Sequence, residues 1–173
     1  KRGAAHVVSV DVGRAQFDWS LRNDERVTLL ERTNIVDVPA LGYAGSFDVA
    51  VCDVSFTSIR TILPAVLELL SVDGAFLTLV KPQFEAAPGE VGEGGIVRDP
   101  AVHARVLADT VRLFAASGLA PLDICASPIK GAKGNREFFL LGVRGSRDVD
   151  ALLCHADALA AHVEALTDKA VRL

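Results

Sequence analysis

The sequence contains no methionine, one tryptophan, one tyrosine and three cysteines among its 173 residues. The odd number and wide spacing of Cys52, Cys125 and Cys154 exclude a disulfide framework and form no zinc-binding pattern. Apolar runs are short, and residues 75–80 fall far below the roughly 20 residues that a membrane span needs. Because no signal peptide is visible either, these absences predict a cytoplasmic protein with no membrane partner.

Positive charge is also scarce. The 18 lysines and arginines are outnumbered by 22 aspartates and glutamates, and the formal net charge is −4. Since contacts with phosphates need a basic surplus, we do not expect the chain to bind nucleic acid by its charge alone. Trp19 and Tyr43 are isolated, which predicts no aromatic platform for stacking bases. Half of the residues are apolar, and this proportion excludes a disordered chain.

Several common catalytic and binding motifs are missing. The sequence has no Gly-x-Ser-x-Gly elbow, no His-Glu-x-x-His, no Cys-x-x-Cys, no Gly-x-Gly-x-x-Gly and no phosphate-binding loop. The four histidines lack the spacing of metal ligands, so no metal site is predicted. The first residues, Lys1-Arg2-Gly3, read as a helix end that turns into a strand, and we expect the sequence to begin partway through a domain.

What the sequence does have is an alternation of strand and helix patterns. Short β-branched or apolar runs predict strands, and apolar residues at a period near 3.6 predict helices. The strongest helix signal has Asp99 as a possible N-cap, Pro100 at the first helical position and Gly118 at the end. An Asp73-Gly74 turn is expected before the fourth strand. Strands are predicted at residues 6–12, 26–31, 46–53, 75–80, 122–126 and 137–143, and helices at residues 15–21, 59–70, 100–117 and 147–173.

Strands that alternate with helices predict an α/β fold, with a mostly parallel sheet and helices on both faces. The last two strands are joined only by the short segment 128–135, so the last strand should run antiparallel to its neighbour. Between the fourth strand and the helix after it lies a polar, glycine-rich segment, residues 85–99. Long loops of this kind are typical of lids over a substrate, with Ile96 and Val97 as its docking points and the rest mobile in the free protein.

Ionisable residues fall where this topology would bring them together. Ligands of open α/β sheets bind at the carboxyl ends of the strands. Asp11, Asp53 and Lys81 each stand at or next to such an end, and Glu137 starts the antiparallel strand, which places it at the same edge. Each also has a simpler interpretation: Asp53 could cap the following helix, and Glu137 could pair with a neighbouring cation. Their joint position at one edge favours a catalytic rim.

Four segments resemble the TlyA-type (haemolysin A) 2′-O-ribose rRNA methyltransferases of the FtsJ-like group. The resemblance implies a Rossmann-like class I methyltransferase fold with an antiparallel last strand, with residues 1–173 as a partial methyltransferase domain. The family's cofactor glycine loop, first strand and first catalytic lysine, and its usual S4-like RNA-binding domain, do not occur in this sequence. We therefore expect an N-terminally truncated domain that is inactive by itself. The segments are Val51-Cys52-Asp53-Val54-Ser55-Phe56, Leu79-Val80-Lys81-Pro82-Gln83-Phe84-Glu85, residues 92–100 and Gly134-Asn135-Arg136-Glu137-Phe138-Phe139-Leu140, and residues 1–24 are also similar.

The resemblance also implies site residues, a cofactor and a partner. Asp53, Lys81 and Glu137 match three members of the family's Lys-Asp-Lys-Glu tetrad. The cofactor is S-adenosyl-L-methionine, and the partner is ribosomal RNA or a ribosomal subunit. Cofactor contacts are expected from Asp11, Val12, Gly13, Thr33, Asn34 and Asp53, and RNA contacts from Arg14, Arg98, Lys130, Lys133 and Arg136.

Two questions stay open at this point. Lys81 could act as a base in its neutral form, or remain charged and stabilise the developing oxyanion. A nicotinamide-dependent oxidoreductase on a similar sheet and a haemolysin-like membrane-active protein are the alternative functions.

Overall fold

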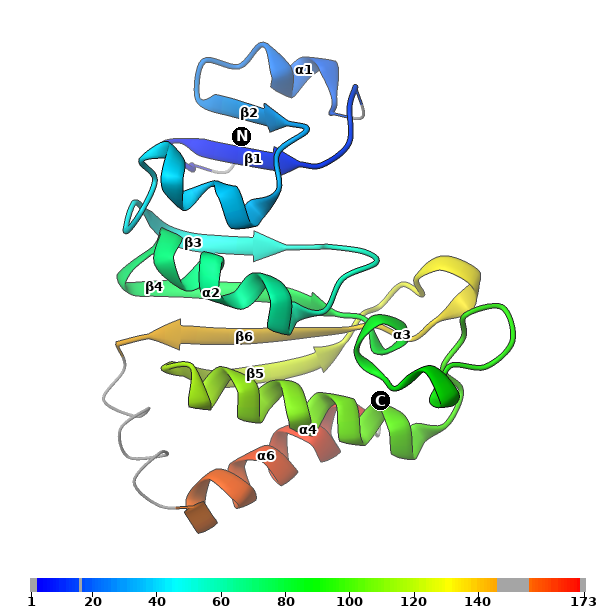
Figure 1. Cartoon of the computed structure of the whole chain (residues 1–173). Helices are drawn as coiled ribbons and strands as arrows, with labels where there is room; N and C mark the ends of the chain where they lie inside the picture. Colours follow the sequence, from blue (N-terminus) through cyan, green and yellow to red (C-terminus); the bar gives the residue numbers. More distant parts are fainter. Residues whose placement is uncertain (1–2, 16, 146–155, 172–173) are drawn as a thin grey trace.

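The computed structural model describes residues 3–15, 17–145 and 156–171. Its strands form two sheets, one of two strands and one of four (Figure 1). The expected α/β class is confirmed, because strands and helices alternate along most of the chain. The first part of the helix predicted at residues 147–173 lies outside the described residues.

The smaller sheet consists of β1 (Val7–Asp11) and β2 (Val27–Glu31), which run parallel. Between them, the helix predicted at residues 15–21 is wrong in position, because α1 spans Trp19–Arg22. Ala15 has a φ of 59°, a left-handed conformation that a right-handed helix cannot include. Its N–H donates instead to Glu31 at 2.6 Å, so the segment after β1 folds back onto the end of β2.

The larger sheet has the order β3-β4-β6-β5. β3 (Phe47–Cys52) and β4 (Leu70–Val80) are parallel, whereas β6 (Phe138–Arg144) is antiparallel to both β4 and β5 (Leu119–Ala126). The antiparallel last strand is therefore confirmed, and it lies between two other strands. Two short 3₁₀ turns, Ile35–Asp37 and Pro39–Leu41, connect the two sheets, and Val38 between them is fully buried.

The turn predicted at Asp73-Gly74 is wrong, because both residues lie inside β4. Phe47 pairs with Leu70 and Val49 pairs with Ala75, so the extra residues form a bulge. Asp-Gly is compatible with a bulge as well as a turn, and Gly74 allows the strands to approach closely. A Cβ atom on Gly74 would lie 3.1 Å from the Phe47 carbonyl oxygen.

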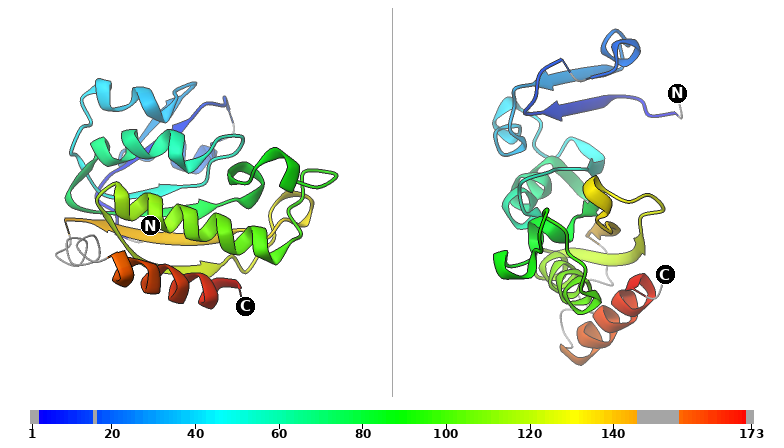
Figure 2. Two further views of the ribbon diagram at one scale, coloured as in Figure 1. Left: turned by 60° about the horizontal axis from the view of Figure 1, so that its bottom comes forward. Right: turned by 90° about the vertical axis from the view of Figure 1, so that its right-hand side faces the viewer.

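Helices α2 (Ile59–Leu69) and α4 (Pro100–Ala116) cover one face of the larger sheet (Figure 2). The predicted signals at the ends of α4 are confirmed: Asp99 accepts a hydrogen bond from Ala101 N at 2.8 Å, and Gly118 has a φ of 81°. Helix α6 (Ala156–Val171) packs against α4 and β5, and its buried side chains join the same core.

The other face of β3 has no helix over it among the described residues. Ala50 and Cys52 pack against the core, whereas the alternate residues Val49 and Val51 are 61% and 75% exposed. The expectation of helices on both faces is therefore not met at this strand. The carboxyl ends of β3 and β4 and the start of β6 lie at one edge, beside the short helix α3 (Pro82–Glu85), as Figure 1 shows.

Candidate active site

Two of the predicted rim residues form an ion pair. Lys81 follows β4 and Asp53 follows β3, and Lys81 Nζ lies 2.6 Å from Asp53 Oδ1. Lys81 also donates a hydrogen bond to Ser55 Oγ at 2.8 Å, a contact that the sequence did not indicate. The lysine side chain is only 11% exposed, whereas that of Asp53 is 71% exposed. A largely buried ammonium group is thus held between two oxygen atoms at the carboxyl edge of the sheet.

Glu137 is buried next to this pair, just before β6. Its Oε1 accepts a hydrogen bond from Gln83 Nε2 at 3.0 Å. Gly131 lies directly beneath the carboxylate, since a Cβ atom there would be 2.1 Å from Glu137 Oε1. The simpler interpretation, a pair with Lys133 or Arg136, is not what the described residues form, because Gln83 is the hydrogen-bond partner of this carboxylate.

Asp53 and Glu137 face one open cleft of about 430 Å³. The cleft therefore brings together the carboxylate that follows β3 and the carboxylate that precedes β6, as the predicted strand topology led us to expect. Its walls combine apolar strand residues with polar loop residues, one of them the cation Lys130. The remaining lining residues are Val51, Cys52, Leu77, Leu79, Ser127, Ile129, Gly131 and Phe139.

Cys52 is the one cysteine in this cleft among the described residues, and its chemistry is unfavourable for nucleophilic attack. Burial raises the pKa of its thiol to about 11. The thiolate is the reactive form of cysteine, so Cys52 is almost wholly protonated near neutral pH. The candidate chemistry of this edge rests on its lysine and carboxylates.

Glu85 ties the rim to the start of α2. Its carboxylate accepts hydrogen bonds from Ser58 Oγ at 2.7 Å and from Ile59 N at 2.7 Å. Burial raises the pKa of Glu85 above its ordinary value. Ser58, which is the N-cap of α2, thereby joins the segment after Asp53 to the segment after Lys81.

Of the residues predicted to hold the cofactor, all but Asp53 end or follow β1 or β2, whereas Asp53 follows β3 in the larger sheet. Asp11 Oδ1 accepts a hydrogen bond from Gly13 N at 2.7 Å, and the Asp11 carbonyl accepts one from Thr33 N at 3.1 Å. Asn34 follows directly and caps the next 3₁₀ turn through Val36 N. Asp11 thus presents an exposed carboxylate at a strand end, an arrangement that can accept hydrogen bonds from the hydroxyls of a ribose.

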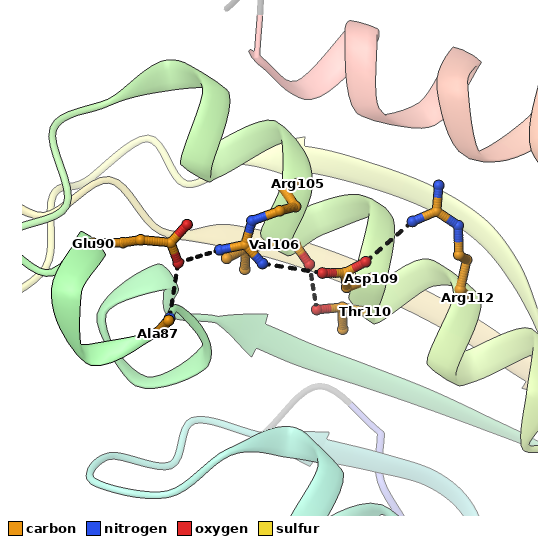
Figure 3. Close-up of polar contacts among 7 residues, drawn as sticks. All are labelled: Ala87, Glu90, Arg105, Val106, Asp109, Thr110 and Arg112. Carbon is orange, nitrogen blue, oxygen red and sulfur yellow. Dashed lines mark hydrogen bonds and ion pairs between the residues drawn. The ribbon is translucent and has the colours of Figure 1, made fainter.

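The first half of the glycine-rich segment 85–99 is joined to α4 by an ion pair. Glu90 forms an ion pair with Arg105 and accepts a hydrogen bond from Ala87 N at 2.9 Å (Figure 3). This ion pair begins a ladder of charged side chains that continues along α4 (Figure 3). In it, Arg105 Nη1 lies 3.2 Å from Asp109 Oδ2, and Arg112 Nη1 lies 3.1 Å from Asp109 Oδ1. Each of these charged side chains is at least partly exposed, so we expect the ladder to orient the segment more than to stabilise it.

The same segment is attached again near its end, at Val97. This residue is buried, as predicted for a docking point, and its N–H donates to Asn135 Oδ1 at 3.1 Å. Asn135 Nδ2 donates to the Gly95 carbonyl at 2.9 Å, and His103 Nε2 contacts the Val97 carbonyl at 3.0 Å. Burial lowers the pKa of His103, which favours its neutral form. Asn135, which sequence reasoning missed, thus joins two loops 40 residues apart.

The cations predicted to contact RNA divide into two groups. Arg98, Lys130 and Lys133 are exposed on the two loops that Asn135 joins, and Arg136 lies 5.8 Å from the centre of the Phe138 ring. Arg14 is exposed on the smaller sheet, after β1. The structure therefore places four of the five beside the rim and one near the predicted cofactor residues.

An exposed aromatic ring lies next to the rim, and no sequence pattern indicated it. Phe56 is 90% exposed and has a φ of 63°, a conformation that is strained for a bulky residue. Its ring lies 5.2 Å from that of Phe84. Phe56 stands three residues after Asp53, so it presents a flat apolar surface on the loop that carries Asp53 and Ser55.

The described residues hold neither a metal-binding cluster nor a helix that could span a membrane. They contain no group of three or more histidine, cysteine, aspartate or glutamate side chains able to hold a metal ion. None of their helices combines the length and apolarity that crossing a bilayer would require.

Comparison with known proteins gives a consistent result. The family model described as FtsJ-like methyltransferase matches residues 1–144. The 16S/23S rRNA (cytidine-2′-O)-methyltransferase TlyA of Mycobacterium tuberculosis is 47% identical over 139 residues, which cover 80% of this chain and 52% of that protein. The chain spans about half the length of the curated relatives that it matches.

Solved structures agree on the fold. A protein of Lactococcus lactis described as a candidate hemolysin is 36% identical and superposes with a TM-score of 0.78, over 83% of this chain and 70% of the other. The 16S rRNA (adenine(1408)-N(1))-methyltransferase of Catenulisporales acidiphilia is 15% identical, with a TM-score of 0.52 over 82% of this chain and 75% of the other. The expected class I methyltransferase fold is therefore confirmed.

Proposed function

Because the chain belongs to the FtsJ-like methyltransferase family, we propose that the whole protein methylates a ribose 2′-hydroxyl of ribosomal RNA, with S-adenosylmethionine as cofactor. The observation that carries this proposal is the rim of the larger sheet. It combines the Lys81–Asp53 ion pair with the buried carboxylate of Glu137, and two of these groups face one cleft. The names of the relatives support rRNA as the substrate class.

In this proposal Lys81 works as a cation. A ribose 2′-oxygen becomes a good nucleophile as it loses its proton, and a nearby positive charge stabilises the negative charge that develops. The ion pair between Lys81 and Asp53, with 2.6 Å between Nζ and Oδ1, is the observation on which this choice rests. Asp53 and Ser55 hold the ammonium in place, and Glu137 orients the hydroxyl.

The cofactor would be held by both sheets. S-adenosylmethionine supplies an activated methyl group when it is bound. Asp11 would accept hydrogen bonds from its ribose hydroxyls, and Thr33 and Asn34 would flank its adenine, with Val12 and Gly13 shaping the turn between them. Asp53 would approach the methionine half, since it follows a strand of the larger sheet.

RNA contacts would come from the loops around the rim. Arg98, Lys130, Lys133 and Arg136 would meet backbone phosphates, and Arg14 would do so from the smaller sheet. Phe56 offers an exposed ring on which an unpaired base could stack beside the rim. Such a substrate places the protein in the cytoplasm with the ribosome.

The test is nucleoside mass spectrometry of rRNA from cells that lack the gene and from cells in which it has been restored. The proposal predicts that one or more 2′-O-methylated nucleosides disappear with the gene and return with it. An unchanged set of 2′-O-methyl nucleosides, or loss of a base methylation instead, would contradict it. A thermal-shift comparison of S-adenosylhomocysteine with NAD, and a liposome-leakage assay, test the oxidoreductase and membrane-active alternatives on the same protein.

A further inference from the structure

The turn that follows β4 contacts three other loops through alternate residues. Lys81 contacts Asp53, Gln83 contacts Glu137, and the third of these residues, Glu85, caps α2. The proposed reaction involves Lys81 and Glu137 but assigns no role to Gln83. Gln83 is the only side chain that donates a hydrogen bond to Glu137 among the described residues.

The position of the Glu137 carboxylate is restricted from two directions. Gln83 Nε2 donates to Oε1 at 3.0 Å, and the α-carbon of Gly131 closes the space on another side. A carboxylate held in this way has little freedom to rotate. Its orientation toward the cleft therefore depends on the amide of Gln83.

The other half of the Gln83 amide is informative because it is not satisfied. Its Oε1 is buried and has no hydrogen-bond partner among the described residues. Rotating the amide by 180° would place this oxygen against the Glu137 carboxylate, so the amide nitrogen must face Glu137. A buried acceptor without a donor costs stability, and such costs are found where function requires the arrangement.

We infer that Gln83 is a positioning residue that orients Glu137 toward the ribose hydroxyl. This inference rests on the proposed function. Gln83 acts through Glu137 and does not contact the reacting atoms. It should therefore affect the rate of transfer more than the binding of RNA or cofactor.

The first test is Gln83→Met in the full-length protein. The variant keeps the length of the side chain but removes the donor, and we expect kcat for methyl transfer to rRNA to fall at least tenfold. KM for RNA and for S-adenosylmethionine should stay within about twofold. Tm should change little, because removing the unsatisfied amide oxygen offsets part of the cost of leaving the Glu137 carboxylate without its donor. The matched control is Thr78→Val, which removes a buried hydroxyl from β4 and should leave kcat unchanged.

A double-mutant cycle tests whether Gln83 acts through Glu137. In a Glu137→Ala background, Gln83→Met should lower kcat by less than twofold. Gln83→Glu gives a second readout, because a protonated carboxyl at position 83 can donate to Glu137 as the amide does. Its kcat relative to wild type should rise as the pH is lowered, whereas that of Gln83→Met should not. The other charged groups around Glu137 are Asp53 and Lys130, which line the same cleft, and Arg136, which precedes Glu137 in the sequence. These groups are unchanged in both variants, so they cannot account for a difference between the two pH profiles.

The outcomes separate the two proposals. An active wild type with an equally active Gln83→Met variant overturns the role of Gln83 and leaves the proposed function intact. A loss of kcat that parallels a fall in Tm, or equal losses in both backgrounds, also overturns it, since either result indicates a general structural role. A wild type that transfers no methyl group to rRNA overturns the proposed function itself.

Discussion

At the scale of single residues, the absence of a side chain is as important as its presence. Glu137 can occupy its position because residue 131 is a glycine whose α-carbon lies against the carboxylate. The φ of Gly131 is −71°, so its backbone would tolerate any residue, and only the lack of space requires glycine. The close approach is therefore specific to the site.

We predict that Gly131→Ala lowers methyl transfer at least tenfold, because its Cβ atom would displace the Glu137 carboxylate. The overpacking should also lower the free energy of unfolding by about 1–3 kcal/mol. Steady-state kinetics and urea unfolding measure the two effects. Gly89→Ala is the control, since a Cβ atom there meets no atom within 4 Å. Equal activity of the two variants would show that Glu137 is not held as described.

At the scale of the elements, side chains from one segment accept hydrogen bonds from backbone N–H groups of another segment. In the first turn of α2, the N–H of Ile59 donates a hydrogen bond to Glu85 of α3, and the N–H of Arg60 donates one to the helix's own cap, Ser58. Asn135 does the same for the segment around Val97. Both contacts cross a large sequence separation, and each makes one loop depend on another.

Glu85 predicts a pH dependence of stability. Burial raises its pKa in the folded state, so the native protein binds this proton more readily than the unfolded chain does. As the pH rises through the interval between the ordinary and the raised value, the contribution of Glu85 to stability is therefore lost. Relative to Glu85→Gln, the wild type should gain stability as the pH is lowered from 7 toward the ordinary glutamate value. Urea unfolding of both proteins measures this difference, and a constant difference would contradict the assignment.

Amide exchange should divide the glycine-rich segment into two parts. The Val97 amide is buried and bonded to Asn135, so its exchange should be slow, whereas the exposed amides of Glu93 and Gly94 should exchange rapidly. Asn135→Ala should abolish the protection of Val97 and cost about 2–4 kcal/mol, because it removes one buried and two partly buried hydrogen bonds. Uniformly slow exchange over residues 91–97 would contradict a mobile tip.

At the scale of the whole molecule, the features that could be predicted from the sequence are those that short stretches of sequence determine. The capped helix α4 and the strand ends that carry Asp53, Lys81 and Glu137 followed from periodicity, caps and strand-end rules. The bulge at Asp73 could not be predicted, because Asp-Gly suits turns and bulges alike. The contact of Gln83 with Glu137 depends on strand order and register, which no local pattern encodes.

The two sheets divide the work of the proposed enzyme. The smaller sheet carries the residues proposed to hold the adenosine half of the cofactor, and the larger sheet carries the rim that would act on the ribose hydroxyl. Substitutions of Lys81 or Glu137 should therefore impair transfer without impairing cofactor binding, whereas substitutions of Asp53, which would also approach the methionine half of the cofactor, should affect both.

The most direct test of this account is tritium transfer from S-adenosylmethionine to rRNA by the full-length protein and its Lys81 variants. Lys81→Ala should abolish transfer while leaving S-adenosylhomocysteine affinity within about threefold of wild type. Lys81→Arg should retain measurable transfer, because arginine remains charged at any accessible pH and can replace a cation but not a base. Complete loss in Lys81→Arg would contradict the role of Lys81 as a cation, and full transfer by Lys81→Ala under saturating cofactor would contradict the catalytic rim itself.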